Sequence, residues 1–414
     1  MSFANLLNLT PKSNKCSNDR FLSPVRKPSH RGSITPDRSN CGINKDFHLS
    51  SEIKGSPRKS ITSNLFMQTG NDPFSSPRRQ SSNFDTSSLK SNSPKLVHYP
   101  SKPLKTIHLP DIPSDFYLSP MDWSKNNVIA LALNSSCAFI SPKSMETLFC
   151  ADVSDGLLSL KYSPAGDEIL FCQHNGCIAI YDTLHLSNPK SEYQVFTEST
   201  LCADWVENTI ACGCRDGTLG FIDNRDSSEV HHINAHNEEL CMVKIAQNSS
   251  LIATSSNDST VKIWDKRSLD QGPLVKYEEH EAAIKALAWS PCNPDIIASG
   301  GGTSDRTIRI WNVNTGETQK VVETGSQVCN LFWNSEYNEI LSTHGFSQNH
   351  LALWKVPDLQ PIASFHSHKQ RVLYMAVSPD GSKIATAAPD DSLQIWKMFP
   401  QKSMSLSESI LLLR

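Results

Sequence analysis

The chain has 414 residues, a net charge of −3 and 38% hydrophobic residues, so it contains enough apolar material for a globular core. It has no signal peptide, no transit-type start and no apolar run long enough to span a membrane, which excludes secreted and integral membrane proteins and leads us to expect a soluble intracellular protein. The charge is uneven, because residues 1–100 carry 15 Lys/Arg against 6 Asp/Glu and the remainder carries 24 against 36. A basic segment followed by an acidic one predicts contacts with acidic surfaces that phosphorylation would weaken.

Residues 1–100 are rich in Ser, Asn, Pro, Lys and Arg and show no sustained hydrophobic period. Such a composition does not offset the entropy of ordering, so we expect a disordered regulatory segment. It contains six Ser/Thr-Pro pairs, and those at Ser56, Ser76 and Ser93 continue into basic residues. This pattern favours sites for a proline-directed kinase, such as a cyclin-dependent kinase, over ordinary linker composition. A fourth candidate, Ser23, follows the apolar island Arg20-Phe21-Leu22, and such islands in disordered segments are typical docking peptides.

A repeat occupies most of the remaining chain, and residues 286–312 form one complete unit. Ala286–Trp289 and Ile296–Ala298 read as strands, the glycines at 300–302 and Asp305 as a turn, and Thr307–Trp311 as a third strand. The residue that closes the third strand recurs with gaps of 41 to 47 residues, at Ile140, Tyr181, Ile222, Trp264, Trp311, Trp354 and Trp396. A period of about 40–45 residues with a Trp-Asp-like end indicates a WD-repeat β-propeller with four strands per blade. We therefore predict an all-β fold with seven blades over 101–400, between the 1–100 segment and a C-terminal segment, 401–414.

Two features of the sequence concern the closure of the ring and the hydrogen bonds within its blades. The last blade leaves little chain after Trp396 for an outer strand, so the extended run Lys105–His108 is our candidate for that strand. Three histidines, His236, His280 and His368, lie 22, 25 and 22 residues before Asp258, Asp305 and Asp390. Because they belong to different blades, we expect each to bond its Asp inside a blade rather than to share a metal ion.

The sequence offers no catalytic constellation. The glycines at 300–302 lack the following helix and Lys of a phosphate-binding loop, and no Gly-x-Ser-x-Gly or His-Glu-x-x-His motif occurs. The 12 cysteines form no Cys-x-x-Cys pair, and most of them, Cys150 and Cys172 included, lie in strand-like apolar settings. Free buried thiols are the expected result. A binding scaffold that uses no cofactor and no metal is therefore favoured over an enzyme.

Several strings are more specific than the repeat. They are Asp115-Phe116-Tyr117-Leu118, His280 to Pro291, Gly300 to Arg306, Thr324 to Leu331, and Ser342 to Asn349. They closely resemble the Fizzy/Fizzy-related family of WD-repeat activators, which bring substrates to the anaphase-promoting complex, a ubiquitin ligase. The resemblance covers the repeat region and the general plan of the N-terminal segment.

The resemblance implies two elements that dock on the ligase. The family's C-box, Asp-Arg-Phe/Tyr-Ile-Pro-x-Arg, is matched here by Asp19, Arg20, Phe21, Leu22, Pro24 and Arg26, with Leu for Ile and one extra residue, Ser23, before the proline. The family's terminal Ile-Arg is matched by Leu413 and Arg414. The altered C-box and short N-terminal segment favour a specialised, meiotic member over a mitotic or G1 member, although the sequence leaves all three branches open.

The resemblance also implies two degron sites. The residues that match the site for the Lys-Glu-Asn box are Asn257, Thr303, Gln348 and Arg371. The turn columns of the repeat put them on one face of the ring, where Arg371 suits the Glu of the box and the neutral side chains suit its amide. The residues that match the site for the Arg of the destruction box (Arg-x-x-Leu) are Asp122 and Asp391, on the first and last blades, which ring closure makes neighbours.

The function expected from these observations is substrate recruitment to the anaphase-promoting complex, in mitosis or meiosis. The expected partners are the core subunits of the ligase, degron-bearing substrates such as cyclins and securin-like proteins, and a cyclin-dependent kinase, with neither nucleic acid nor membrane. The expected location is the nucleus and cytoplasm. The alternative is a generic WD-repeat peptide-binding scaffold, which would need neither the Asp19–Arg26 element nor a terminal aliphatic-Arg pair.

Overall fold

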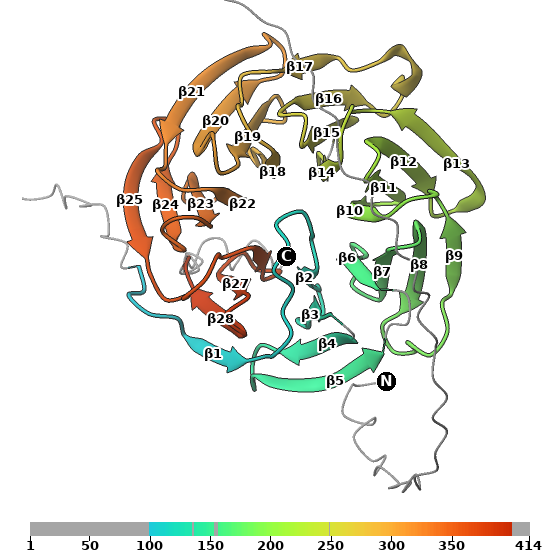
Figure 1. Ribbon diagram of the computed structural model, residues 1–414, viewed down its shortest axis with the longest axis horizontal. Helices are drawn as coiled ribbons and strands as arrows, with labels where there is room; N and C mark the ends of the chain where they lie inside the picture. The colour runs from blue at the N-terminus through green and yellow to red at the C-terminus, as the bar shows by residue number, and fades with distance from the viewer. Residues whose placement is uncertain (1–98, 135, 153–155, 248, 400–414) are drawn as a thin grey trace, which may run out of the picture. The chain divides into compact units, whose positions relative to one another are not determined.

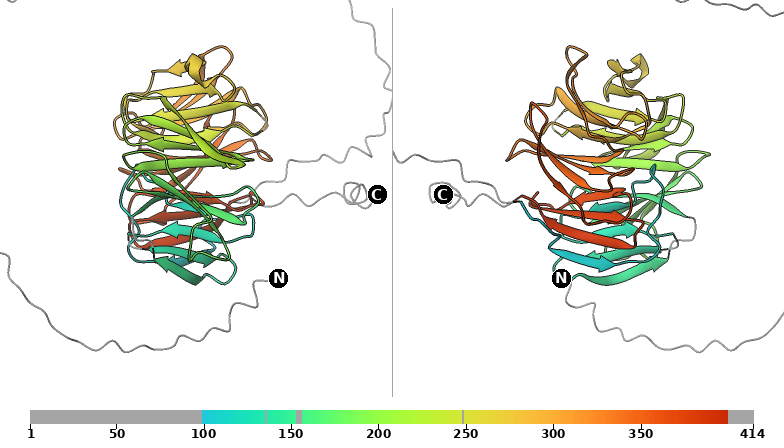
Figure 2. Two further views of the ribbon diagram at one scale, coloured as in Figure 1. Left: turned by 90° about the vertical axis from the view of Figure 1, so that its right-hand side faces the viewer. Right: turned by 60° about the vertical axis from the view of Figure 1, so that its left-hand side comes forward.

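The computed structural model describes residues 99–399, apart from residues 135, 153–155 and 248. They form seven four-stranded antiparallel sheets arranged as blades around a central channel (Figure 1). In Figure 2 the blades are seen edge on, and their strands run between the two faces of the ring. The predicted seven-bladed propeller is confirmed, whereas the expectations for 1–98 and 400–414 lie outside the described residues.

Six blades are built from consecutive strands, with the first strand of each at the channel. Blade 1 contains β2 (Met121–Trp123), β3 (Ile129–Ala132), β4 (Ser136–Ser141) and β5 (Glu146–Asp152). Blade 2 contains β6 (Leu157–Tyr162), β7 (Glu168–Gln173), β8 (Cys177–Asp182) and β9 (Ser191–Gln194). Blade 3 contains β10 (Thr200–Val206), β11 (Thr209–Cys214), β12 (Thr218–Asp223) and β13 (Asp226–Asn234).

The next three blades repeat this order. Blade 4 contains β14 (Leu240–Ile245), β15 (Leu251–Ser256), β16 (Val261–Asp265) and β17 (Val275–Tyr277), with a short 3-10 helix at Leu269–Gln271. Blade 5 contains β18 (Ile284–Trp289), β19 (Ile296–Gly301), β20 (Thr307–Asn312) and β21 (Glu317–Glu323). Blade 6 contains β22 (Val328–Asn334), β23 (Glu339–His344), β24 (Leu351–Lys355) and β25 (Gln360–Phe365).

Blade 7 closes the ring with strands from both ends of the repeat region. It contains β26 (Tyr374–Val377), β27 (Lys383–Ala388) and β28 (Ser392–Lys397), and its outer strand is β1 (Lys105–His108). β1 pairs antiparallel with β28, from Lys105 opposite Ile395 to His108 opposite Ser392. The predicted ring-closing strand is thus confirmed, and it ties the start of the described chain to its end.

Because the strands are antiparallel, the connecting loops alternate between two faces. We call the upper face the one formed by the turns between second and third strands and by the loops that enter each first strand. The lower face carries the turns between first and second strands. The upper and lower mouths of the channel open on these two faces.

Two details of the sequence interpretation need correction. Gly300 and Gly301 were expected in a turn, but they belong to β19. Glycine is needed at these positions because a Cβ atom at Gly300 would lie 2.4 Å from the Val328 side chain, and one at Gly301 would lie 2.0 Å from the Asp305 carboxylate. These glycines permit close packing inside the blade. Cys150 was expected to be buried but is exposed, because it lies on β5, the outermost strand of blade 1.

The three predicted histidines bond their aspartates as expected. In blade 4, His236 Nδ1 lies 3.1 Å from Asp258, and its Nε2 lies 2.8 Å from Thr254 Oγ1, which also accepts from Trp264 Nε1 at 2.9 Å. Blades 5 and 7 repeat the network with His280 and His368. Burial raises the pKa of the Asp258 carboxyl, but hydrogen bonds from His236 and Thr260 outweigh it and leave that pKa well below its usual range. Each network fastens an upper-face loop to an upper-face turn of the same blade.

Blade 6 has a similar hydrogen-bond network, but with a histidine from a different position. Ser342 Oγ accepts from Trp354 Nε1 at 2.7 Å and lies 2.7 Å from Nε2 of His344, which comes from β23 itself rather than from an entering loop. The His344 ring stacks on His350 at 4.4 Å between centroids, and burial lowers the pKa of His344 to about 3. A neutral ring therefore replaces the His-Asp pair in this blade.

Candidate functional site: the upper mouth of the channel

Residues 109–120, which we call the crossing segment, run from β1 on the outside of blade 7 to β2 at the channel, over the upper face (Figure 1). The Tyr374 hydroxyl lies 3.0 Å from the Pro113 carbonyl and 2.9 Å from that of Asp115. At the far end, the Tyr117 hydroxyl donates to Asn257 Oδ1 at 3.1 Å. The crossing segment is therefore tied to blade 7 and to blade 4, across the channel.

A buried lysine supports this segment from below. Lys285 is 1% exposed, and its Nζ donates to the Leu373 carbonyl at 3.2 Å. The same Nζ lies 5.0 Å from the centroid of the Tyr374 ring and 5.7 Å from that of Phe116, which is in the crossing segment. Burial lowers the pKa of Lys285 to about 8. The aromatic rings and one carbonyl replace water around this ammonium group.

The four residues predicted for the Lys-Glu-Asn box all lie on the upper face. Asn257, Thr303 and Gln348 are in the turns β15–β16, β19–β20 and β23–β24, and Arg371 is in the loop that enters β26. The structure brings Arg371 next to the turn of Gln348, because its guanidinium lies 4.8 Å from the centroid of the Phe346 ring. It does not join Thr303 to the others by a side-chain bond, since the bond recorded at Thr303 is to its carbonyl, from Arg306 Nε at 2.6 Å.

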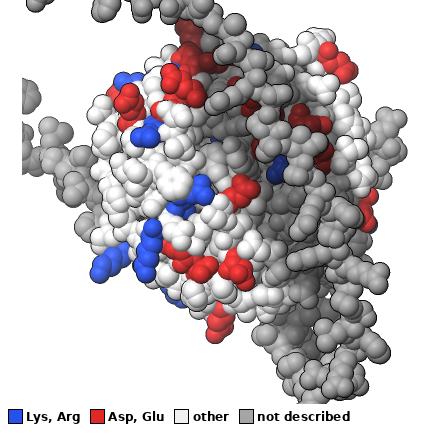
Figure 3. Space-filling model, in the orientation of Figure 1, with Lys and Arg blue, Asp and Glu red and all other residues white. Residues whose placement is uncertain are grey.

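Arg371 is the charged residue among the four predicted for this surface. It donates to the Ser114 carbonyl at 2.8 Å and lies 3.3 Å from the Ser114 hydroxyl. Within the part of the chain that the structure describes, no carboxylate forms an ion pair with it. On the described part of the face in Figure 3, basic and acidic side chains are interspersed. A half-buried arginine without a carboxylate partner among the described residues, flanked by neutral donors and acceptors, suits a short peptide with one acidic side chain.

The sequence interpretation missed four contacting residues of this site: Ser114, Tyr117, Phe346 and Tyr374. Phe346 is 54% exposed, an unusual exposure for an aromatic side chain. Tyr117 belongs to the string that carried the family resemblance, but only the path of the crossing segment shows that it reaches Asn257. No local pattern encodes a contact between residues 140 positions apart.

The two aspartates predicted for the destruction box have separate partners. Asp122, on β2, accepts from the backbone N–H of Tyr162 at 3.0 Å and pairs with Lys161 Nζ at 3.2 Å, so it faces blade 2. Asp391 lies in the β27–β28 turn, and its carbonyl accepts from the Leu109 N–H at 2.8 Å. Asp391 therefore lies on the upper face, whereas Asp122 bonds blade 2 toward the lower mouth. The structure joins neither carboxylate to the other, and their shared role stays a prediction.

The remaining predicted residues, in the C-box-like element, at the kinase sites and at the C-terminus, lie outside the described residues. In the described ranges, no helix is long and apolar enough to cross a membrane. Nor do residues 99–399, with their short gaps, contain a group of His, Cys, Asp and Glu arranged to hold a metal ion.

Seven antiparallel blades, intrablade His-Asp networks and a ring closed by an N-terminal strand define a WD-repeat propeller with a polar surface at one mouth of its channel. Residues 107–396 match the family described as the CDC20/Fizzy WD40 domain. The chain is 32% identical to the WD repeat-containing protein srw1 of Schizosaccharomyces pombe, over 94% of this chain and 75% of srw1. It is 31% identical to the APC/C activator protein CDH1 of Saccharomyces cerevisiae, over 80% of this chain and 60% of that protein.

A solved structure is similar as well. A chain of the crystal structure of the mitotic checkpoint complex superposes with a TM-score of 0.70 at 30% identity, covering 78% of this chain and 99% of that one. The chain belongs to the CDC20/Fizzy family of WD-repeat proteins.

Proposed function

We propose that this chain is an activator subunit that recruits degron-bearing substrates to the anaphase-promoting complex and has no catalytic step of its own. Family membership supports the proposal, as does the name of its relative CDH1, an APC/C activator. The observation that carries the substrate-binding part is Arg371, which lies on the upper face beside exposed Phe346 without a carboxylate partner among the described residues. A generic peptide-binding scaffold remains the alternative.

In this proposal the upper face binds the Lys-Glu-Asn box, with the Glu of the box at Arg371. Asn257 presents its amide to the same surface, although the Tyr117 hydroxyl already uses its Oδ1. The Asn257 amide nitrogen is the group left to donate to a peptide carbonyl or amide. The crossing segment acts as the floor on which the peptide lies.

The proposal places the Arg of the destruction box at Asp122 and Asp391. Lys161 already neutralises Asp122, so an incoming arginine would have to share that carboxylate or displace the lysine. The bond from the Tyr162 N–H would still hold the Asp122 carboxylate in place beside such an arginine.

The docking elements and the kinase switch complete the proposal. Asp19–Arg26 and the pair Leu413–Arg414 would hold the ligase, and phosphates at Ser23, Ser56, Ser76 and Ser93 would each add about −1.5 to −2 charge and release the basic segment. The proposal places this binding in the nucleus and cytoplasm, with cyclins and securin-like proteins as substrates.

Reconstituted ubiquitination tests the proposal. The core ligase should modify a fragment that contains Lys-Glu-Asn and Arg-x-x-Leu only when the full chain is added. Deleting Leu413 and Arg414 should abolish this stimulation while the fragment still binds the chain. If the full chain neither stimulates the ligase nor binds it, the chain is a scaffold of another kind.

For the kinase switch, a Ser23/Ser56/Ser76/Ser93→Ala variant should keep ligase binding after treatment with a cyclin-dependent kinase, whereas the wild type should lose it. Equal binding by the two proteins, with phosphates confirmed on the wild type, would remove the switch.

A further inference from the structure

One equivalent position on the first strand of each blade forms a column of side chains around the channel. These side chains are charged in some blades and apolar in the others. The column is formed by the residue just before Trp123, Tyr162, Trp205, Ile245, Trp289, Trp333 and Val377, which lie at or next to the ends of the first strands. Its members in blades 1 to 7 are Asp122, Lys161, Asp204, Lys244, Ala288, Phe332 and Ala376. The first four blades therefore carry alternating charges, and the last three carry apolar groups.

The alternation leaves one cation unpaired. Lys161 lies between two carboxylates, 3.2 Å from Asp122 and 3.9 Å from Asp204. Asp204 also accepts from the Ile245 N–H at 2.9 Å. The next lysine in the column, Lys244, has Ala288 on its other side, and among the described residues no carboxylate lies at ion-pair distance from its Nζ.

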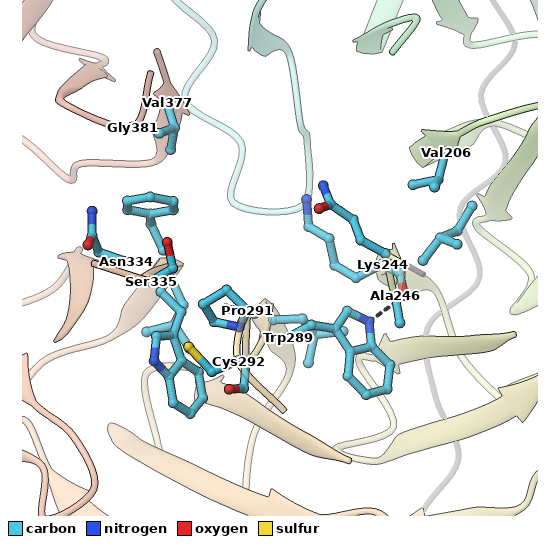
Figure 4. Close-up of a pocket in the computed structure, with 18 of the residues that line it drawn as sticks. Val206, Lys244, Ala246, Trp289, Pro291, Cys292, Asn334, Ser335, Val377 and Gly381 are labelled. Carbon is cyan, nitrogen blue, oxygen red and sulfur yellow. Dashed lines mark hydrogen bonds between the residues drawn. The ribbon is translucent and has the colours of Figure 1, made fainter. Parts of the chain in front are cut away.

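Lys244 opens into a cavity of about 750 Å³ at the lower mouth of the channel. Figure 4 shows Lys244 at one side of this cavity, Asn334 and Ser335 at the other, and Trp289, Pro291 and Cys292 between them. Most of the wall from blades 5 and 6 is apolar and aromatic. The cavity thus combines a cation on one side with a surface for bulky apolar side chains on the other, a combination that suits a peptide.

The cavity wall also contains the last described residue, Phe399. Phe399 is 2% exposed and packs on Phe332 and Tyr337, with centroids 5.9 Å apart in both pairs. The chain continues for 15 residues, 400–414. Because they start at the cavity wall, their effective concentration there is on the order of millimolar.

The order of side chains in this segment matches the order of groups across the cavity. Lys402 comes first, three positions after Phe399. Glu336 and Asp380 line the same cavity as Phe399. Apolar Met404 and Leu406 follow, and then Glu408, which is the sole acidic side chain of 400–414. Glu408 is nine positions after Phe399, a span of up to about 30 Å when extended, which is enough length for Glu408 to reach across the mouth of the channel.

We propose that residues 400–414 bind back into the lower mouth of the channel, with Glu408 paired to Lys244 and the apolar side chains against Trp289 and Phe332. A consequence, which rests on the proposed function, is that the bound state keeps Leu413 and Arg414 at the propeller and away from the ligase. Residues 400–414 would then alternate between the propeller and the ligase.

Cys292 provides the test, because it is exposed and lines the cavity. Alkylation with iodoacetamide, followed for each cysteine by mass spectrometry, should be roughly fivefold slower at Cys292 in the full chain than in a chain that ends at Phe399. Cys150, exposed on β5 and outside the cavity lining, is the internal reference and should react equally in both.

A charge reversal separates specific binding from general crowding. Glu408→Lys, which leaves the propeller unchanged, should speed the reaction of Cys292 as truncation does, and adding Lys244→Glu should restore the slow rate. Lys266→Glu, exposed and outside the cavity lining, is the matched control for Lys244→Glu and should not restore it. Equal rates in the full and truncated chains, fast or slow, would overturn the proposal, and so would an unchanged rate in Glu408→Lys. None of these readouts involves the ligase, so they do not depend on the proposed function.

Discussion

The two mouths of the channel are held by different chemistry. At the upper mouth, bonds within blades 4, 5 and 7 fasten the turns, as His280 does with Asp305, and the crossing segment spans from blade 7 to blade 4. At the lower mouth, bonds between neighbouring blades do the same work, from Asp122 to the Tyr162 N–H and from Asp204 to the Ile245 N–H.

This difference matters for binding. The upper mouth has several of its turns fixed and holds the half-buried Arg371 against the crossing segment, so it presents a preorganised polar surface for a short motif. The lower mouth keeps an aromatic cavity beside Lys244, which suits a peptide that brings its own apolar side chains.

The largest effect is expected for His280→Ala. His280 is 1% exposed and Asp305 3% exposed as side chains, so the substitution leaves a buried carboxylate without its partner and should lower the free energy of unfolding by about 3 kcal/mol or more. Urea unfolding measures this. The control is His185→Ala, whose side chain is 79% exposed and lies 3.8 Å from Asp182, and it should change stability little. A small effect at both positions would show that the networks do not hold the upper turns.

The networks were largely predictable from the sequence, because His, Asp and Trp recur at fixed distances in blades 4, 5 and 7. The network of blade 6 was not predictable, because its histidine, His344, lies on β23 itself, two positions after the Ser342 that it contacts. The three-glycine run was misread for a related reason. Sequence alone marks Gly300 as a turn former, while the neighbouring blade's Val328 explains its place in a strand.

The next effect concerns the buried ammonium beneath the crossing segment. The pKa of Lys285 falls from an ordinary value of 10.5 to about 8, so between these pH values the unfolded chain binds the proton that the native chain has lost. Stability from this group therefore rises with pH through that window. Met has no such proton, so the stability of Lys285→Met relative to wild type should fall by about 2–3 kcal/mol between pH 7 and pH 10. Urea unfolding at both pH values gives the difference, and a constant difference would contradict the shifted pKa.

A smaller effect is expected for Asp122→Asn. The amide oxygen keeps an acceptor for the Tyr162 N–H, while the charge next to Lys161 is lost. An Arg-x-x-Leu peptide should then bind about 1–2 kcal/mol more weakly, as for a lost charge-assisted bond, and a Lys-Glu-Asn peptide should bind as before. Calorimetric titration of the two peptides checks this. If the Arg-x-x-Leu affinity does not change, Asp122 serves the packing of blades 1 and 2 alone.

The site was predictable in part. The turn columns placed Asn257, Thr303 and Gln348 on one face, because the repeat fixes which turns share a side of the ring. The crossing segment was not predicted, since its contacts join residues such as Ser114 and Arg371, 257 positions apart. The partners of Asp122 were missed. Ring closure predicts that blades 1 and 7 are neighbours, but it does not predict that the Asp122 side chain faces blade 2 instead.

The central claim is that the upper mouth reads an acidic residue through Arg371. The direct measurement is calorimetric titration of a Lys-Glu-Asn peptide into the purified full chain, its Arg371→Ala variant and an Arg267→Ala control, since Arg267 is exposed and paired with Asp265 away from the upper mouth. We expect Arg371→Ala to bind roughly 30-fold more weakly, about 2 kcal/mol, and Arg267→Ala to bind like the wild type. Equal affinities for all three proteins, or no binding by the wild type, would contradict the claim.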